Sequence, residues 1–518
     1  MRAFHGSREL ARQLTPLTPT DAGRIATALR SRGARVAVLL AGAIPFVVYL
    51  RTMAPTVYGL DSAELTTGSY VLGIVHAPGS PTFLLLGHLF TWLPVGDVGY
   101  RVNLVSVVAA AAAMAFFCAV LLRLLRDPFA ATAGAWLLAF TYYFWVSAVA
   151  AELYSLQACF LAALIWLSLR WRSEQRPWQL YLFALCFGVG LGNHLSLVFA
   201  APGMVILLRS DDRHALPSIR HLAVAAIWGL LGASVYAYLP LRSHAPLNFA
   251  RAFGVDVATW QGFWWMVTGQ MFSSQMLAVP LAQIPGEIAF FIGRLFSNFI
   301  GVSALVGILG VVDGFRQRPD VHLGLATIFA GHLAFVLTYD VVDKEFMLVP
   351  TFLIWTIWTT VGCQAIARGV SAWTHGTIAI PVGALLLMMA AGNLAINVNR
   401  VDLSDDWSAR RRGEDLFAYL PPRAVYVAGW GDVPILDYLQ LVEKQRDDVE
   451  TLNVFLATQP ERIRFVEQRL RSGRPVFVAA RVEIPNVNAN FEYVPACECY
   501  RVRPRSTGPE GAAPAASR

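Results

Sequence analysis

The stretch APTVYGLDSAELTTGSYVLGIVHAPGSP, residues 54–81, follows the first long apolar run and decides how the rest of the chain is organised. It carries Asp61, Glu64 and His76, and the prolines at 78 and 81 break any continuous helix. Two carboxylates and an imidazole are costly against lipid, and the prolines argue against an ordinary spanning helix. The stretch therefore predicts a membrane-surface loop that holds an acid–base site.

The composition of the chain is that of a membrane protein. Hydrophobic residues make up 56% of its 518 residues and charged residues 14%, which is unusual for a soluble chain. The net charge of +7 is almost all arginine between apolar runs, so it indicates topology and predicts no nucleic-acid partner. The C-x-C pair of Cys497 and Cys499 lacks the second pair that a structural zinc site needs.

Apolar runs predict an α-helical polytopic protein with about 11 spans. The runs at 178–192 and 195–208 are short, and one long span broken at Asn193-His194 is the alternative. The arginine-rich N-terminus is too long and polar for a cleaved signal peptide, so the first span is expected to be a retained anchor. The runs lie near 36–53, 102–123, 128–149, 154–170, 178–192, 195–208, 221–240, 284–312, 321–339, 346–367 and 376–396.

Arginine placement predicts the orientation. Arginines cluster in alternate connections together with the basic N-terminus, which puts the N-terminus in the cytoplasm and the C-terminal segment outside. This assignment requires that 81–94 lies at the interface without crossing. We expect a multi-pass protein of the plasma membrane, such as a bacterial inner membrane. The chemically informative residues then all fall on the external side: Asp61, Glu64, His76, Glu152, Tyr154, Asn193, His194, Arg242, Asp340, Asp343 and Lys344.

The D-S-A-E sequence at 61–64 supplies the candidate base. Its two carboxylates share one face if the segment is helical, and a carboxylate placed at the reacting atom can deprotonate a hydroxyl nucleophile. Asp61 is the first candidate and Glu64 the second. A capping pair at a helix start is the alternative for both residues.

The other external residues are assigned to substrate or donor-phosphate binding. Arg242 suits a phosphate through forked hydrogen bonds, with a headgroup anchor as the alternative, and Lys344 either binds phosphate or neutralises the acids beside it. His76 and His194 lack metal-site spacing, so hydrogen bonding to phosphate is favoured and neither a metal nor a cofactor is predicted. Glu152 either binds substrate or supports a helix start. The same binding assignment covers Tyr154, Asn193, Asp340 and Asp343.

The external loop at about 241–283 and the C-terminal segment complete the organisation. Clustered aromatic residues at 260–265 predict an interfacial helix that either anchors the loop or walls a groove for a lipid tail. Beyond residue 397 the segments 424–430 and onward to PVFVAAR predict a β-α-β-α-β order, hence a small α/β domain with a partly parallel sheet. The predicted domains are a basic N-terminus (1–35), a membrane domain (36–396) with its first external loop (54–101), the α/β domain (397–505) and a disordered tail (506–518).

Several motifs together resemble a large multi-pass family long described only as a domain of unknown function. GLDSAEL followed by GIVHAPGSPTF is similar to its first-loop signature, although the turn reads HAPG where relatives have HPPG. Further similar segments follow in order: FWVSAVAAELYSL, GLGNHLSLVFAAP, YLPLRSHAPLNFA, VTGQMF and YDVVDKEFMLVPTFL. The family includes an animal endoplasmic-reticulum protein O-mannosyltransferase that acts on plexin-type receptor domains.

The resemblance implies a glycosyltransferase C fold and a polyprenyl-phosphate sugar as donor, without metal. It also implies that the loop aspartate, here Asp61, acts as base in an inverting transfer. The expected function is transfer of a sugar, with mannose as a candidate, to serine or threonine of an exported protein. Transfer to an envelope glycan or lipid is one alternative. A transporter or flippase of polyprenyl-linked glycans is another, but it would favour ionisable residues spread through the membrane and an internal repeat.

Overall fold

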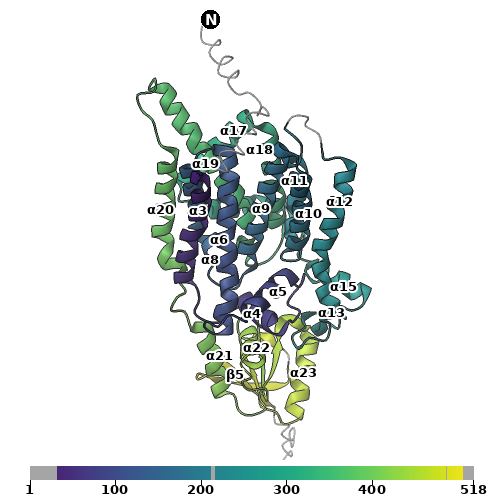
Figure 1. Ribbon diagram of the computed structural model, residues 1–518. Helices are drawn as coiled ribbons and strands as arrows, with labels where there is room; N and C mark the ends of the chain where they lie inside the picture. Colours follow the sequence, from purple (N-terminus) through teal and green to yellow (C-terminus); the bar gives the residue numbers. More distant parts are fainter. Residues whose placement is uncertain (1–31, 212–215, 486, 506–518) are drawn as a thin grey trace, which may run out of the picture.

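The structure is a computed structural model that describes residues 32–211, 216–485 and 487–505. Long helices form one body, and a small C-terminal domain lies at one end of it (Figure 1). Most of the predicted basic N-terminus (1–31) and the predicted disordered tail (506–518) lie outside the described residues.

Long apolar helices confirm the predicted polytopic architecture. Within the described residues, seven are long and apolar enough to cross a membrane, or eight if one bent pair counts as a span. The predicted total of about 11 spans stays a prediction, because the remaining apolar helices are short. The long helices are α3 (Arg32–Thr52), α6 (Val98–Leu125), α9 (Leu153–Glu174), α12 (Ile219–Ala233, with its continuation to Leu241), α18 (Pro319–Thr338), α19 (Val349–Trp373) and α20 (Val382–Val401). The short ones are α5 (Pro81–Phe90), α7 (Pro128–Ala139), α10 (Pro177–Leu191) and the η1–α11 pair (Leu195–Leu207).

The runs at 178–192 and 195–208 form two segments, α10 and η1–α11, separated at Asn193 and His194. Near the end of α9, Trp171 Nε1 donates a 3.0 Å hydrogen bond to the carbonyl of Leu208, which follows α11. Since α10 also starts beside the end of α9, the chain leaves this end through α10 and returns to it through α11. The structure therefore favours two segments over one long broken span.

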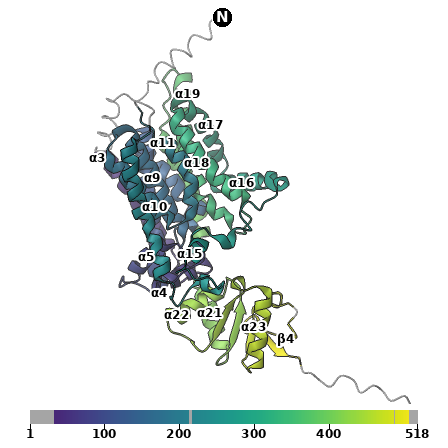
Figure 2. The same ribbon diagram turned by 90° about the vertical axis from the view of Figure 1, so that its right-hand side faces the viewer.

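Two predicted runs prove to be divided. The run at 284–312 forms α16 (Ile284–Asn298) and α17 (Val302–Gln317), which meet at 110°, and Figure 2 shows α16 projecting sideways. Ile300 and Gly301 between them have φ of 43° and 50°, outside the range of a right-handed helix. The run at 128–149 is divided into α7 and α8 (Tyr142–Val146) because the intervening Thr141 is extended.

A buried asparagine of α6 holds the first external loop. Asn103 Nδ2 donates to the carbonyls of Ala54 and Thr56 at 3.1 and 2.9 Å, and its Oδ1 accepts from the N–H of Ala151 at 2.9 Å. The loop continues into α4 (Asp61–Val71) and then α5, both near the C-terminal domain in Figure 1. Asn103 thereby holds the segment that precedes α4 against the segment that precedes α9.

The largest external loop, at about 241–283, contains a helix at its aromatic cluster (260–265), as the sequence predicted. Trp260 at its start is 74% exposed, which suits a ring at headgroup level. Several residues of the segment 268–276, which follows this helix, line the cavity described below. The loop elements are α13 (Tyr238–Leu241), α14 (Phe249–Ala252), α15 (Trp260–Val267), η3 (Gln270–Phe272) and η4 (Leu281–Gln283).

The C-terminal domain contains a five-stranded sheet of order β2-β1-β3-β5-β4. β1 pairs in parallel with both β2 and β3, which confirms the predicted partly parallel sheet. The antiparallel β4–β5 hairpin extends the sheet beyond the last strand that the sequence predicted. The elements are α21 (Ser408–Tyr419), β1 (Val425–Ala428), α22 (Val433–Leu441), β2 (Glu450–Asn453), α23 (Gln459–Arg471), β3 (Val476–Val478), β4 (Ala489–Val494) and β5 (Cys499–Pro504).

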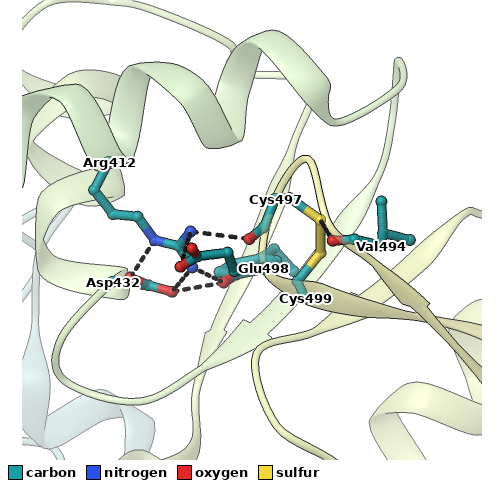
Figure 3. Close-up of a disulfide and its surroundings, with 7 residues drawn as sticks. Arg412, Asp432, Val494, Cys497, Glu498 and Cys499 are labelled. Atoms are coloured by element: carbon teal, nitrogen blue, oxygen red, sulfur yellow. Dashed lines mark hydrogen bonds and ion pairs between the residues drawn. A yellow bond between two sulfur atoms is a disulfide. The ribbon is translucent and has the colours of Figure 1, made fainter.

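Figure 3 shows a disulfide between Cys497, in the turn that joins β4 to β5, and Cys499, the first residue of β5. Arg412 on α21 donates to the carbonyl of Cys497 at 2.9 Å and pairs with Asp432 at 3.1 Å. Asp432 follows β1, in the loop that also carries Trp430. The disulfide turn is thus tied to this loop, which reaches the candidate site.

Candidate active site

A cavity of about 560 Å³ lies where the first external loop, the start of α9, the largest external loop and the C-terminal domain meet. Its wall is mostly apolar, with ionisable side chains gathered among the apolar ones. Sequence-predicted residues that line it are Asp61, His76, Glu152, Tyr154, His194 and Asp343.

Asp61 begins α4, and its side chain is 36% exposed. Its Oδ1 accepts a 2.7 Å hydrogen bond from Nε1 of Trp430, a residue of the C-terminal domain. Its Oδ2 lies 3.9 Å from Nε2 of His76. One oxygen of this carboxylate is therefore oriented by an indole, while the group as a whole borders the cavity.

Glu64 lies behind His76 and does not line the cavity. Its Oε2 lies 2.5 Å from Nδ1 of the imidazole, and its Oε1 accepts from the backbone N–H of His76 at 2.8 Å. Burial lowers the pKa of His76, but the nearby charges of Glu64 and Asp61 outweigh burial and raise that pKa to about 10. His76 is therefore an imidazolium at neutral pH. Its Nδ1 is paired with Glu64, and its Nε2 is available at the cavity.

Glu152 adds a second acid to the cavity, at the position just before α9. Burial, and then the charges of Asp61 and Asp343, raise the pKa of Glu152 well above its ordinary value. Asp343, which follows α18, also lines the wall. A carboxyl group that keeps its proton can donate a hydrogen bond as well as accept one, which suits the hydroxyls of a sugar.

Tyr154 and His194 form an aromatic part of the wall, with ring centroids 5.7 Å apart. Burial lowers the pKa of His194 to about 4, so this imidazole is neutral, in contrast to His76. Its Nδ1 lies 2.8 Å from the hydroxyl oxygen of Ser196. Asn193 does not line the cavity; its Nδ2 donates to the carbonyl of Leu153 at 3.1 Å and so ties the His194 turn to α9.

The remaining predicted residues lie outside the cavity wall. Arg242 donates from Nε and Nη2 to the carbonyls of Leu72 and Val71 at 2.8 and 2.9 Å, and so caps the end of α4 roughly 15 Å from its start. Lys344 Nζ pairs with Glu287 at 2.7 Å. Asp340 is exposed. A role of these residues in phosphate binding stays a prediction, and His76 is the cation that the cavity itself presents.

The cavity wall also contains residues to which the sequence assigned no role, although Phe249 and Phe272 lie in segments that resemble the family. Trp430 and Phe455 come from the C-terminal domain, and Phe249, Phe272 and Gln275 from the largest external loop. Trp430 stands edge-on to His76, with centroids 6.0 Å apart. The side-chain oxygen of Gln275 is buried without a hydrogen-bond partner in the described part of the chain. Only the contacts that these residues make in the folded structure show that they line the cavity.

Comparison with known proteins agrees with the motifs. A family model described as the N-terminal domain of the protein O-mannosyl-transferase TMEM260 matches residues 61–216, which contain much of the site. The family resemblance is confirmed. The protein O-mannosyl-transferase tmem260 of Dictyostelium discoideum is 23% identical over 465 residues, covering 79% of this chain and 56% of that protein. The TMEM260 protein of Mus musculus is 31% identical over 225 residues, covering 42% of this chain and 31% of that protein.

The chain spans about half the length, or less, of these curated relatives. Among solved structures, ArnT from Cupriavidus metallidurans bound to undecaprenyl phosphate gives a TM-score of 0.56 at 10% identity, covering 91% of this chain and 98% of that one. The apo state of the same protein gives 0.55. This likeness covers the helical body and the C-terminal domain together, and it confirms the predicted glycosyltransferase C type of fold.

Proposed function

We propose that this protein is a membrane glycosyltransferase that moves a sugar, mannose in the first instance, from a polyprenyl phosphate to a hydroxyl group. The observation that carries the proposal is the pairing of Asp61, held by Trp430, with the imidazolium of His76 at 3.9 Å in one largely apolar cavity. A base for the acceptor and a cation for the leaving phosphate thus stand side by side.

In the proposed reaction, the acceptor oxygen attacks the anomeric carbon and its proton passes to Asp61. The bond between the anomeric carbon and the phosphate oxygen breaks, and the electron pair leaves with the lipid phosphate. Nε2 of His76 makes no hydrogen bond within the described residues, so it is free to donate to that phosphate as charge develops. Attack opposite the leaving group inverts the anomeric centre. Glu64 acts as a positioning residue that keeps His76 charged.

The donor and acceptor are inferred from the surroundings of the cavity and from the relatives. Apolar wall residues such as Val198, Phe199 and Phe335 suit a prenyl chain, and the ArnT structure was solved with undecaprenyl phosphate. The relatives named protein O-mannosyl-transferases favour serine or threonine of a protein as acceptor. We place the cavity and the disulfide-containing domain outside the cytoplasm, because disulfides persist in oxidising compartments.

Purified full-length protein in nanodiscs tests this proposal. With radiolabelled mannosyl-phosphoryl-undecaprenol and serine- or threonine-containing peptides, we expect labelled peptide to form, whereas a nucleotide-linked mannose should give none. Movement of the labelled lipid between the leaflets of sealed vesicles, without any glycosylated product, would instead establish the flippase alternative and overturn the proposal.

Replacing Trp430 with phenylalanine tests whether the C-terminal domain orients the base. The ring remains against His76 and Phe249, but the indole donor to Asp61 is lost. Because a hydrogen bond to a charged group contributes about 1.5–3 kcal/mol, we expect kcat to fall about tenfold or more with little change in the KM for the donor. Trp407→Phe, in the same part of the chain but away from the cavity, is the control. Equal effects of the two substitutions would contradict the role.

A further inference from the structure

A second cavity, of about 810 Å³, lies on the body between α3, α6 and α9 and shares no lining residue with the first. Its floor is the face of α6 that carries Ala111, Ala112, Ala115 and Ala119. These small side chains leave a trough between the larger residues of the flanking helices, such as Phe46 and Trp166. The surface is therefore recessed and apolar over most of its length.

One end of this groove is strongly basic. Arg35, Arg123 and Arg170 line it, and Glu174 is the single acid among the lining residues. Glu174 pairs with Arg123 at 2.7 Å and with Arg170 at 2.8 Å, so one carboxylate faces two guanidinium groups. Arg35, which is exposed, has no ion-pair partner in the described part of the chain. The end of the groove thus carries a surplus of positive charge.

Arg123 adds a buried cation to this end of the groove. The residue is only 4% exposed, and its Nε is buried without a hydrogen-bond partner in the described residues. Its other nitrogens are engaged by Glu174, by the hydroxyl of Ser173 and, more distantly, by the carbonyl of Leu169. Arg123 is therefore a buried cation that α9 holds at the basic end of the groove, where its charge adds to those of Arg35 and Arg170.

The basic end faces away from the candidate active site. Asn103, which holds the first external loop, and Arg123 lie twenty positions apart on the single helix α6, or roughly 30 Å. The basic end is therefore on the membrane face opposite the C-terminal domain, which the arginine distribution predicts to be cytoplasmic. Leu39 and Ala43 on the α3 wall are exposed, so the groove opens sideways toward the bilayer.

We propose that this groove is a binding site for one anionic glycerophospholipid of that leaflet. The phosphate would lie among Arg35, Arg123 and Arg170, and an acyl chain would follow the alanine floor of α6. Guanidinium groups suit phosphate oxygens, and the surplus positive charge calls for a net negative headgroup. The proposed sugar donor is a different occupant, because the cavity assigned to it opens at the other end of the same helices. Unselective contact with bulk lipid would not require a recessed apolar groove with three arginines at one end.

Native mass spectrometry of the purified, delipidated full-length protein tests the proposal. Dioleoyl phosphatidylglycerol is titrated against dioleoyl phosphatidylcholine, which has the same chains and phosphate but a neutralising choline, and against undecaprenyl phosphate. We expect the first phosphatidylglycerol to bind at least about fivefold more tightly than phosphatidylcholine, the ratio that one favourable charge interaction at a membrane surface gives. Undecaprenyl phosphate should not displace it.

Two variants and a control locate the site. Arg35→Gln removes an exposed cation that has no ion-pair partner among the described residues, and it should abolish the preference for phosphatidylglycerol without affecting folding. Ala43→Trp should fill the groove and weaken the first binding event about tenfold. Ile44→Trp, one position along on the same exposed helix but outside the groove, should leave binding unchanged. Equal binding of both phospholipids, displacement by undecaprenyl phosphate, or the same behaviour in all three variants would overturn the proposal.

Discussion

Replacing Asp61 with asparagine is expected to lower the turnover of sugar transfer by about 100-fold to 10,000-fold, the range that a general base contributes. Asparagine keeps an oxygen that can accept the hydrogen bond from Trp430, so the local geometry should be retained. The amide cannot take up the proton of the acceptor hydroxyl. Transfer from mannosyl-phosphoryl-undecaprenol, measured as initial rate at saturating donor, reports the loss directly.

Asp405→Asn is the matched control for this substitution. Asp405 is also an aspartate outside the apolar helices, but it is exposed and lies outside the cavity wall. Its replacement should leave the rate within a factor of about two, as for most surface changes. Equal turnover in wild type and Asp61→Asn would remove Asp61 as the base and leave the proton without an acceptor in the proposed mechanism.

Replacing Glu64 with glutamine is expected to lower both stability and turnover while leaving the cavity wall unaltered. Glutamine can still accept from the backbone N–H of His76, but the negative charge that holds the imidazolium is gone. Removing one partner of a buried ion pair costs about 3–5 kcal/mol. Without the charge, the pKa of His76 should fall well below about 10, and a neutral His76 would stabilise the leaving phosphate poorly. We expect turnover at neutral pH to fall about 100-fold.

The pH dependence of thermal unfolding separates this effect from a simple packing defect. His76 has a higher pKa in the folded state, about 10, than the ordinary 6.5. The folded state therefore holds an extra proton between these values, so the stability that comes from protonated His76 is complete just below 6.5 and is lost as pH rises toward 10. Wild type should lose stability across this window, and Glu64→Gln should show a flatter profile. The control Glu414→Gln, whose partner Arg410 is near the surface, should keep the wild-type slope.

Much of the site could be predicted from the arginine distribution, because that distribution assigns Asp61, His76, Glu152 and His194 to the same face of the membrane. The sequence could not distinguish a carboxylate that faces the cavity from one that faces a neighbour. Asp61 and Glu64 are three residues apart on the same short helix. Glu64 nevertheless pairs with His76, whereas Asp61 lines the cavity. That difference depends on where the turn at residue 76 folds back.

The roles of the basic residues were the least predictable part of the candidate site. Arg242 follows a span in a way that suits a lipid phosphate, but the carbonyls at the end of α4 compete for the same donors and hold it. Trp430 was unpredictable for the opposite reason, since no spacing connects a tryptophan of the soluble domain to an aspartate 369 residues earlier. The bend at Ile300 and Gly301 could not be predicted from hydropathy, because hydropathy reports the length and composition of an apolar run but not the direction of its backbone.

The hydrogen bond between Asp61 and Trp430 also has a consequence for biosynthesis. The ribosome makes the acidic loop early, but its indole partner emerges only after all the long apolar helices have been synthesised. A chain whose synthesis stopped during membrane insertion would contain the proposed base, Asp61. It would lack both the hydrogen bond from Trp430 and the part of the cavity wall that the C-terminal domain supplies. Sugar transfer by incompletely synthesised chains would then be slowed without a dedicated inhibitor, because the site is complete only after the domain that carries Trp430 has been made.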